Sequence, residues 1–278
     1  MFGRRPDGKV EKNIDPIVRM TSHIMPKRYD AQVFVKRALN YDTIREYLKT
    51  KREEGIKFTH MDVIIAAYLK VIKKHPEFNR FVVNRKIYNR NEVTVSLTIL
   101  KDRNEDGTVN ETVIKVKFDP DDTIFDVNKK MSEEILKNRE AEQKNFTDKL
   151  ARFFLAIPLV PGTAVGIVKL LDKVGLLPKF VLDALPFHTS LFITNMASIR
   201  MGYVYHHIYD FGTTSIFMSI GQKETKLDMD KEDHIIKKSE LPLGIVIDER
   251  ICSGATYAMG FNYFERLLKN PACLEEKE

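Results

Sequence analysis

Hydrophobic residues recur along the chain with two different spacings, and these spacings predict where strands and helices form. Short apolar runs bounded by turn residues are typical of strands. Apolar residues three and four positions apart are typical of helices with one buried face. The pattern predicts strands at 31–39, 81–88, 93–101, 112–118, 190–196, 214–221 and 243–248, and helices at 42–54, 60–74, 123–143 and 254–269.

The order of these elements indicates the fold class and the number of domains. Predicted strands and helices alternate along the chain, which favours an α/β or α+β fold. A length of 278 residues suits one large domain, so we expect 1–278 to form a single unit. Residues 1–30 are polar and contain three prolines, and we expect them to run extended over the surface.

The segment 150–186 departs from this pattern because it is unusually apolar. No charged residue occurs over 153–168. A membrane span needs about 20 apolar residues, and helix-breaking residues interrupt this segment. We predict two or three short helices, packed as an insertion on the core and broken near Pro158, Gly162 and Pro178. A lid over an apolar tunnel, a subunit contact and a contact with a membrane surface remain alternatives.

Charge and cysteine usage narrow the function classes. The chain carries 45 Lys and Arg against 39 Asp and Glu, a formal charge of +6, and the two signs are mixed along it. Without a basic arm, we expect no nucleic-acid partner, although a mildly basic surface suits an anionic ligand. No histidine spacing resembles a zinc site, and we expect no metal.

Two further features bear on the cellular compartment. The two cysteines, Cys252 and Cys273, exclude a disulfide scaffold and suit a reducing compartment. The charged N-terminus lacks the apolar stretch of a signal peptide. We therefore expect a cytoplasmic protein.

The most informative segment is LPLGIVIDERICSGATYAMGFNYFERLLKNP, residues 241–271. It resembles the end of dihydrolipoyl acyltransferase catalytic domains, in which a strand runs into Asp-His-Arg, two apolar residues and Asp-Gly-Ala before a helix. Four positions match this pattern: Asp248, Arg250, Gly254 and Ala255. Cys252 occupies an apolar position of the pattern and is expected to be a small buried thiol.

Other segments resemble the same family in the same order. SLFITNMASI at 190–199 and FGTTSIFMSIGQ at 211–222 resemble two of its successive strands. KFTHMDVIIAAYLKVIKKHPEFN at 57–79 resembles a helix that ends near its substrate channel. The chain is thus similar to a stand-alone, divergent member of the 2-oxoacid dehydrogenase acyltransferase and chloramphenicol acetyltransferase-like superfamily.

This resemblance implies a fold, an assembly and a substrate. The fold would be a two-layer sandwich with a mixed sheet and helices on one side. The assembly would be a homotrimer with active sites between subunits, and coenzyme A would enter as an acyl-CoA thioester. Because the similarity begins near residue 15, no lipoyl or subunit-binding domain is expected.

The resemblance also assigns roles to individual positions. In the family a His acts as general base on the attacking thiol or hydroxyl, and a hydroxyl side chain stabilises the oxyanion. Thr194 stands at the hydroxyl position, but Glu249 stands at the His position. Ser253 replaces an Asp that orients the family's loop.

These replacements leave two functions open. A carboxylate with an ordinary pKa near 4.3 is a weaker base at neutral pH than an imidazole near 6.5. Transfer would then be impaired, or altered to use Glu249 or a neighbouring His206 or His207. The alternative is a binding or scaffolding trimer that keeps the fold without catalysis.

Overall fold

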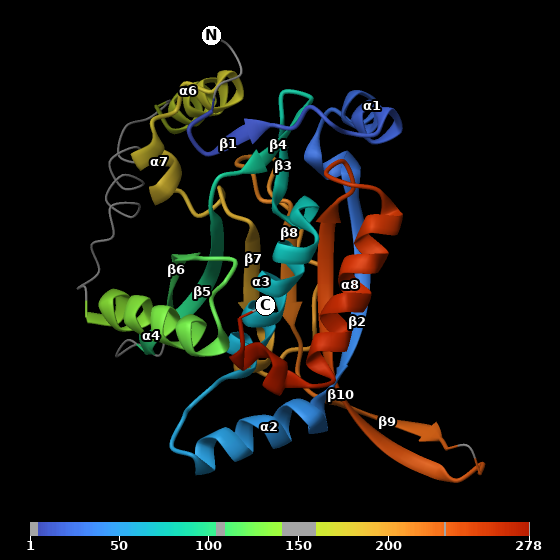
Figure 1. The fold of residues 1–278 in the computed structure, drawn as a ribbon. Helices are drawn as coiled ribbons and strands as arrows, with labels where there is room; N and C mark the ends of the chain where they lie inside the picture. Colours follow the sequence, from blue (N-terminus) through green and yellow to red (C-terminus); the bar gives the residue numbers. More distant parts are fainter. Residues whose placement is uncertain (1–4, 104–108, 141–159, 231, 278) are drawn as a thin grey trace.

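A mixed seven-stranded sheet forms the centre of the fold (Figure 1). The computed structural model describes residues 5–103, 109–140, 160–230 and 232–277. Strand order is β2-β10-β8-β7-β5-β6, with β9 paired to β10. Only the β5–β7 and β7–β8 pairings are parallel among these described strands. The strands are β2 (Gln32–Asn40), β5 (Val93–Arg103), β6 (Val109–Phe118), β7 (Leu191–Asn195), β8 (Ile216–Ile220), β9 (Glu224–Met229) and β10 (Ile235–Asp248).

Helices pack on one face of this sheet, as Figure 1 shows for α3 and α8. The main helices are α2 (Tyr41–Glu53), α3 (His60–Lys74), α4 (Ile124–Glu140) and α8 (Gly254–Leu268). A capping box starts α3: the Thr59 side chain accepts from the Asp62 backbone N–H while Asp62 accepts from that of Thr59. The predicted two-layer α/β architecture is confirmed.

Alternation along the strands supplies two hydrophobic clusters, one on each face of the sheet. On the helix side, Ile193, Met218 and Ile245 join the main core. On the other side, a smaller cluster contains Phe192, Ile208, Phe217 and Val246. The segment that supplies Ile208 crosses the strands closely, since a Cβ on Gly244 would lie 2.4 Å from the Val204 carbonyl oxygen.

A second, three-stranded sheet lies at one end of the main sheet (Figure 1). Its strands are β1 (Gly8–Val10), β3 (Arg80–Val83) and β4 (Lys86–Arg90). The two residues between β3 and β4, Asn84 and Arg85, have φ of 49° and 61°. Positive φ at both positions gives the type I′ hairpin turn, in which Asn is common but Arg is strained.

The N-terminal segment corrects one prediction. Residues 1–30 were expected to be extended, but α1 (Pro16–Ile24) lies within them. The Asp15 side chain accepts hydrogen bonds from the Ile17 and Val18 backbone N–H groups, and Pro16 occupies the first helical turn. An N-cap Asp followed by Pro is a helix-start signal, and the proline count concealed it.

Two strand predictions also change. The run predicted as one strand at 81–88 is the β3–β4 hairpin, because the tight turn at Asn84 interrupts it. β10 starts eight residues before the predicted 243–248, and β9 was not predicted. The β9–β10 hairpin projects from the sheet (Figure 1), so its strands lack the one-sided burial that alternation detects.

The apolar insertion forms α6 (Val160–Val174) and α7 (Lys179–Ala184). Pro178 precedes α7 as its N-cap, which confirms a break there. The break predicted near Gly162 is wrong, because α6 runs through that residue. The break predicted at Pro158 lies outside the described residues. No helix in the described parts of the chain has the length and apolar character to cross a bilayer.

We predict opposite stability effects for two Gly→Ala changes in helices. A Cβ on Gly260 of α8 would lie 2.2 Å from the buried Phe78 ring, so Gly260→Ala should destabilise the fold by ~1–3 kcal/mol. A Cβ on Gly166 of α6 meets nothing within 4 Å, so Gly166→Ala should be neutral or stabilise by up to ~1 kcal/mol. Urea unfolding of both variants measures the difference. Equal effects would show that α8 tolerates a shift away from Phe78.

Candidate functional site

The loop after β10 is organised by the buried carboxylate of Asp248. The Arg250 guanidinium donates from Nε to Asp248 Oδ1 at 2.8 Å and from Nη2 to Oδ2 at 2.6 Å. Arg28 Nε lies 3.4 Å from the same Oδ2. The Asp248 side chain is fully buried, and both arginine side chains are nearly so. One carboxylate therefore serves two buried cations, leaving a net positive charge.

Arg28 links this carboxylate to three other segments. It lies in a short 3-10 turn, Arg28–Ala31, before β2. Its Nη1 donates to the Tyr209 and Gly212 carbonyls at 3.0 and 2.8 Å, and its Nη2 donates to the Val82 carbonyl at 3.2 Å. Burial lowers the pKa of Arg28, and the Asp248 carboxylate acts in the opposite direction.

Glu249 is half-buried beside this pair but is not part of it. Its backbone N–H donates to the Ala31 carbonyl at 3.0 Å. Its carboxylate has no hydrogen-bond or ion-pair partner among the described residues. Arg250 pairs with Asp248 and donates to the Met25 carbonyl, so its hydrogen bonds within the described structure go to residues other than Glu249.

Ser253 has a local structural role. Its Oγ accepts from the Thr256 backbone N–H at 3.2 Å, which makes it the N-cap of α8. It also lies 3.0 Å from the Thr256 hydroxyl, and no contact joins it to Glu249 among the described side chains. Cys252 is buried as expected, and burial raises the pKa of its thiol to about 12. A thiol with that pKa is almost fully protonated at neutral pH.

Thr194 lies at the other end of the sheet from Glu249. On β7 it pairs with Ser219 of β8, which pairs with Gly244 of β10. Glu249 follows Gly244 by five residues, or roughly 16 Å of extended chain. The two side chains therefore do not meet within one chain. Their approach across a subunit interface stays a prediction.

The two candidate histidines lie in the segment that covers the far face of the sheet. His206 stacks between His207 and Phe217, with ring centroids 4.6 and 4.3 Å apart. Its Nδ1 lies 2.8 Å from the His207 carbonyl oxygen. These contacts give His206 a packing role and do not join it to Thr194 or Glu249. Among the described residues no three or more His, Cys, Asp or Glu side chains are arranged to hold a metal ion.

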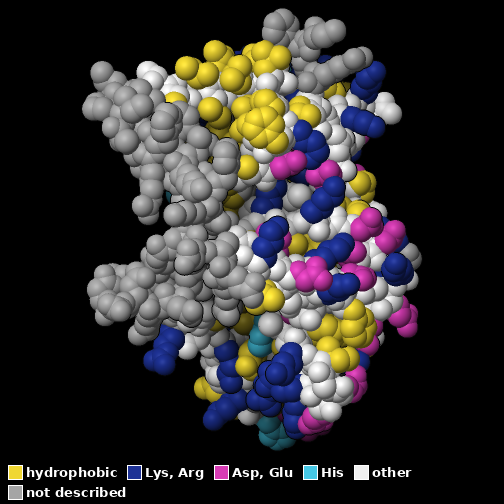
Figure 2. Space-filling view, turned by 90° about the vertical axis from the view of Figure 1, so that its left-hand side faces the viewer, with side chains coloured by type: hydrophobic (Ala, Val, Ile, Leu, Met, Phe, Trp, Pro, Cys, Tyr) yellow, Lys and Arg dark blue, Asp and Glu magenta, His cyan; other side chains and the backbone are white. Residues whose placement is uncertain are grey.

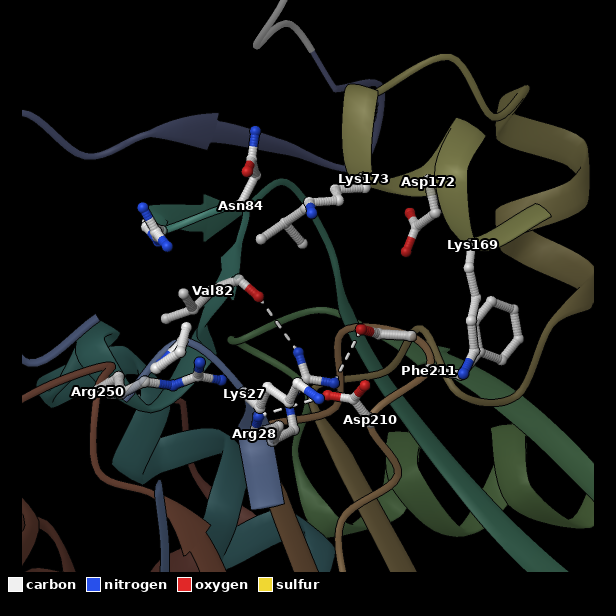
Figure 3. Close-up of a pocket in the computed structure, with 14 residues that line it drawn as sticks. Lys27, Arg28, Val82, Asn84, Lys169, Asp172, Lys173, Asp210, Phe211 and Arg250 are labelled. Carbon is white, nitrogen blue, oxygen red and sulfur yellow. Dashed lines mark hydrogen bonds between the residues drawn. The ribbon is translucent and has the colours of Figure 1, made fainter. Parts of the chain in front are cut away.

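A pocket of about 560 Å³, which we call the basic pocket, is lined in part by Arg28 and Arg250, the two arginines that pair with Asp248 (Figure 3). Its wall is built by the β3–β4 hairpin, α6, the 210–212 loop and the residues around Arg28. Its charged lining residues are Lys27, Arg28, Arg85, Lys169, Lys173, Arg250, Asp172 and Asp210. Neither Thr194 nor Glu249 is among the residues that line it.

The basic pocket has no clear signature in the sequence. Arg28 and Arg250 are far apart in sequence, and the lysines come from the insertion. A local signal was present in Lys169 and Lys173, which are four residues apart and therefore share one side of a helix. That signal is common on solvated helices and does not identify a pocket.

Known structures place the fold. No family model matches the sequence, and no curated protein matches it either. The cubic core of the pyruvate dehydrogenase multienzyme complex superposes with a TM-score of 0.59 at 13% identity, covering 95% of this chain and 94% of that one. The chain has the fold of the 2-oxoacid dehydrogenase acyltransferase cores and of chloramphenicol acetyltransferase.

Two further structures support this assignment. A probable dihydrolipoamide acetyltransferase from Listeria monocytogenes gives a TM-score of 0.56 at 14% identity, covering 95% of each chain. Chloramphenicol acetyltransferase gives 0.53 at 8% identity, covering 94% of this chain and 99% of that one. At these identities the likeness concerns the fold, and the chemistry must be argued from the residues.

We predict that Asp248→Asn is strongly destabilising. The change removes the negative charge from between two buried guanidinium groups, and breaking a buried ion pair in this way costs about 3–5 kcal/mol. Urea unfolding measures the loss. Asp210→Asn is the matched control, because Asp210 is exposed and, among the residues that the structure describes, accepts only a long 3.4 Å bond from the Arg28 backbone. A loss below ~1 kcal/mol for Asp248→Asn would show that the arginines do not need this counterion.

Proposed function

We propose that the protein is a symmetric trimer of the acyltransferase fold that binds an acyl-CoA thioester and transfers the acyl group slowly or in an altered way. The observation that supports this is the placement of Thr194 and Glu249 at opposite ends of one sheet. In such an arrangement a hydroxyl from one copy and a carboxylate from the next can complete a site. Free cysteine thiols agree with a cytoplasmic location.

The proposed reaction is general-base acyl transfer. An acceptor thiol or hydroxyl attacks the thioester carbonyl carbon while Glu249 takes its proton. Thr194 of the neighbouring copy donates a hydrogen bond to the oxyanion of the tetrahedral intermediate. The intermediate then expels the CoA sulfur, and Glu249 returns the proton to it. The acyl group ends on the acceptor, and free CoA leaves.

Two contacts explain why this transfer would be slow. Arg250 and Ser253 follow Glu249 by one and four residues, but Arg250 pairs with Asp248 and Ser253 caps α8. The Glu249 carboxylate therefore lacks a described side-chain partner that would orient it. A base must be held within a fraction of an ångström of its productive position to act efficiently.

The second candidate function is non-catalytic binding or scaffolding by the same trimer. The contacts of Arg250 with Asp248 and of Ser253 with Thr256 favour this function. They maintain the shape of the loop, but they do not orient the Glu249 carboxylate as a base. CoA would still bind in this case, but the thioester would stay intact.

We predict that the protein is trimeric in solution and releases CoA from acyl-CoA in the presence of a thiol or hydroxyl acceptor. Light scattering coupled to gel filtration gives the assembly, and thiol detection gives the release. Glu249→Gln should slow release at least tenfold, since general-base catalysis contributes about 10²–10⁴. Glu133→Gln, at an exposed position of α4, should leave the rate unchanged. Equal rates in all three proteins would exclude Glu249 as the base, and binding without release would favour the scaffold.

We predict that Glu249→His alone will not produce strong activity. The new imidazole would lack an orienting carboxylate, because Ser253 continues to cap α8. The double change Glu249→His with Ser253→Asp should be at least tenfold faster than the single change, and Asp retains the capping ability. Steady-state CoA release compares them. High activity from Glu249→His alone would contradict this view of the loop.

A further inference from the structure

The basic pocket has a large excess of positive charge. Six cationic and two acidic side chains line it. Arg28 and Arg250 share the single carboxylate of Asp248 beneath it. The side chains of Arg85, Lys169 and Lys173 form no ion pair or hydrogen bond with any residue that the structure describes. We propose that this pocket binds a small phosphate-bearing molecule, and this inference does not depend on acyl transfer.

The α6 wall of the pocket is held firmly in place. Arg5 donates from Nη2 to the Asp172 carboxylate at 2.7 Å and from Nη1 to its carbonyl oxygen at 2.6 Å. Arg5 also pairs with Asp7 of the N-terminal segment. The Asp172 carboxylate is therefore ion-paired with Arg5, which it shares with Asp7. Lys169 and Lys173 face the cavity one turn apart (Figure 3).

The apolar side of α6 points elsewhere. Val165, Ile167 and Leu170 are exposed, and Figure 2 shows hydrophobic side chains gathered at the upper end of this side of the molecule. The insertion was predicted to pack on the core, and a lid over an apolar tunnel, a subunit contact and a membrane-surface contact were the alternatives. On the side that lines the pocket, α6 presents Lys169 and Lys173, so the insertion adds positive charge to the pocket.

The opposite wall is formed by the strained β3–β4 turn. Arg85 adopts φ of 61°, a conformation that is unfavourable for a side chain of this size. Its carbonyl oxygen accepts from the buried Ser22 hydroxyl at 3.0 Å. Glycine is the preferred residue at this position of a type I′ turn. An arginine that is kept at an energetic disadvantage beside a cationic pocket indicates a function for its charge.

Size and chemistry together favour a phosphate ester. A volume of about 560 Å³ lies within the usual range of small-molecule sites, about 300–1,000 Å³. Among the lining residues Phe211 is the one aromatic ring, which disfavours an apolar acyl chain as the occupant. Arginine and lysine are the side chains that bind phosphate most effectively, by paired hydrogen bonds and by point charge.

Titration calorimetry with pyrophosphate tests the proposal on the intact protein. Lys169→Glu with Lys173→Glu should weaken binding at least tenfold. The matched control is Lys129→Glu with Lys137→Glu, which makes the same charge change on exposed positions of α4 outside the pocket and should alter binding less than threefold. No measurable binding to the unaltered protein, or equal weakening in both double variants, would overturn the proposal.

Arg85→Gly separates a binding role from a structural one. Glycine removes the cation and relieves the positive φ, so pyrophosphate binding should weaken by about threefold or more while the melting temperature stays the same or rises. Unchanged binding would remove Arg85 from the site. Loss of stability would show that its side chain holds the turn.

Competition with CoA identifies the source of the phosphate. If CoA displaces pyrophosphate and loses affinity in the Lys169→Glu, Lys173→Glu variant, the pocket binds the phosphates of the acyl donor. If CoA and pyrophosphate bind independently, the pocket serves a separate phosphate ester. A failed transfer assay alongside intact pyrophosphate binding would sink the proposed function and leave this inference standing.

Discussion

The buried carboxylate of Asp248 is the interaction on which this end of the molecule depends. It lies at the end of β10, and through Arg28 and Arg250 it connects the N-terminal segment, the 209–212 loop and the β3–β4 hairpin. Two guanidinium groups in a nearly dry environment would be very costly without it. The same arrangement leaves one uncompensated positive charge under the basic pocket, so the structural ion pair also determines which ligands the pocket favours.

The loop after β10 shows that a fold and the chemistry it carries place separate demands on sequence. Asp248, Arg250 and Gly254 match the acyltransferase pattern that the sequence resembles, and they fix the strand end, its counterion and the start of α8. Positions 249 and 253 differ from the pattern that the sequence resembles, and among the described residues their side chains make no hydrogen bond or ion pair beyond the α8 cap. Resemblance across this loop is therefore evidence for architecture first.

Sequence patterns predicted what depends on neighbours along the chain. The capped helix α3 and the core strands β7 and β8 were found because their burial is regular. Helix α1 was missed although Asp15 and Pro16 mark its start. Contacts between distant positions had no local signature: Arg28 reaches Asp248 across 220 residues, and the basic pocket draws its lining from several segments.

The separation of Thr194 from Glu249 has a genetic consequence. A chain altered at Thr194 still carries an intact Glu249 end, and a chain altered at Glu249 still carries an intact Thr194 end. In the proposed trimer, any ring that contains both kinds of chain has one interface where two intact ends face each other. Alleles that inactivate opposite ends of the sheet would therefore complement one another, whereas two alleles at the same end would not.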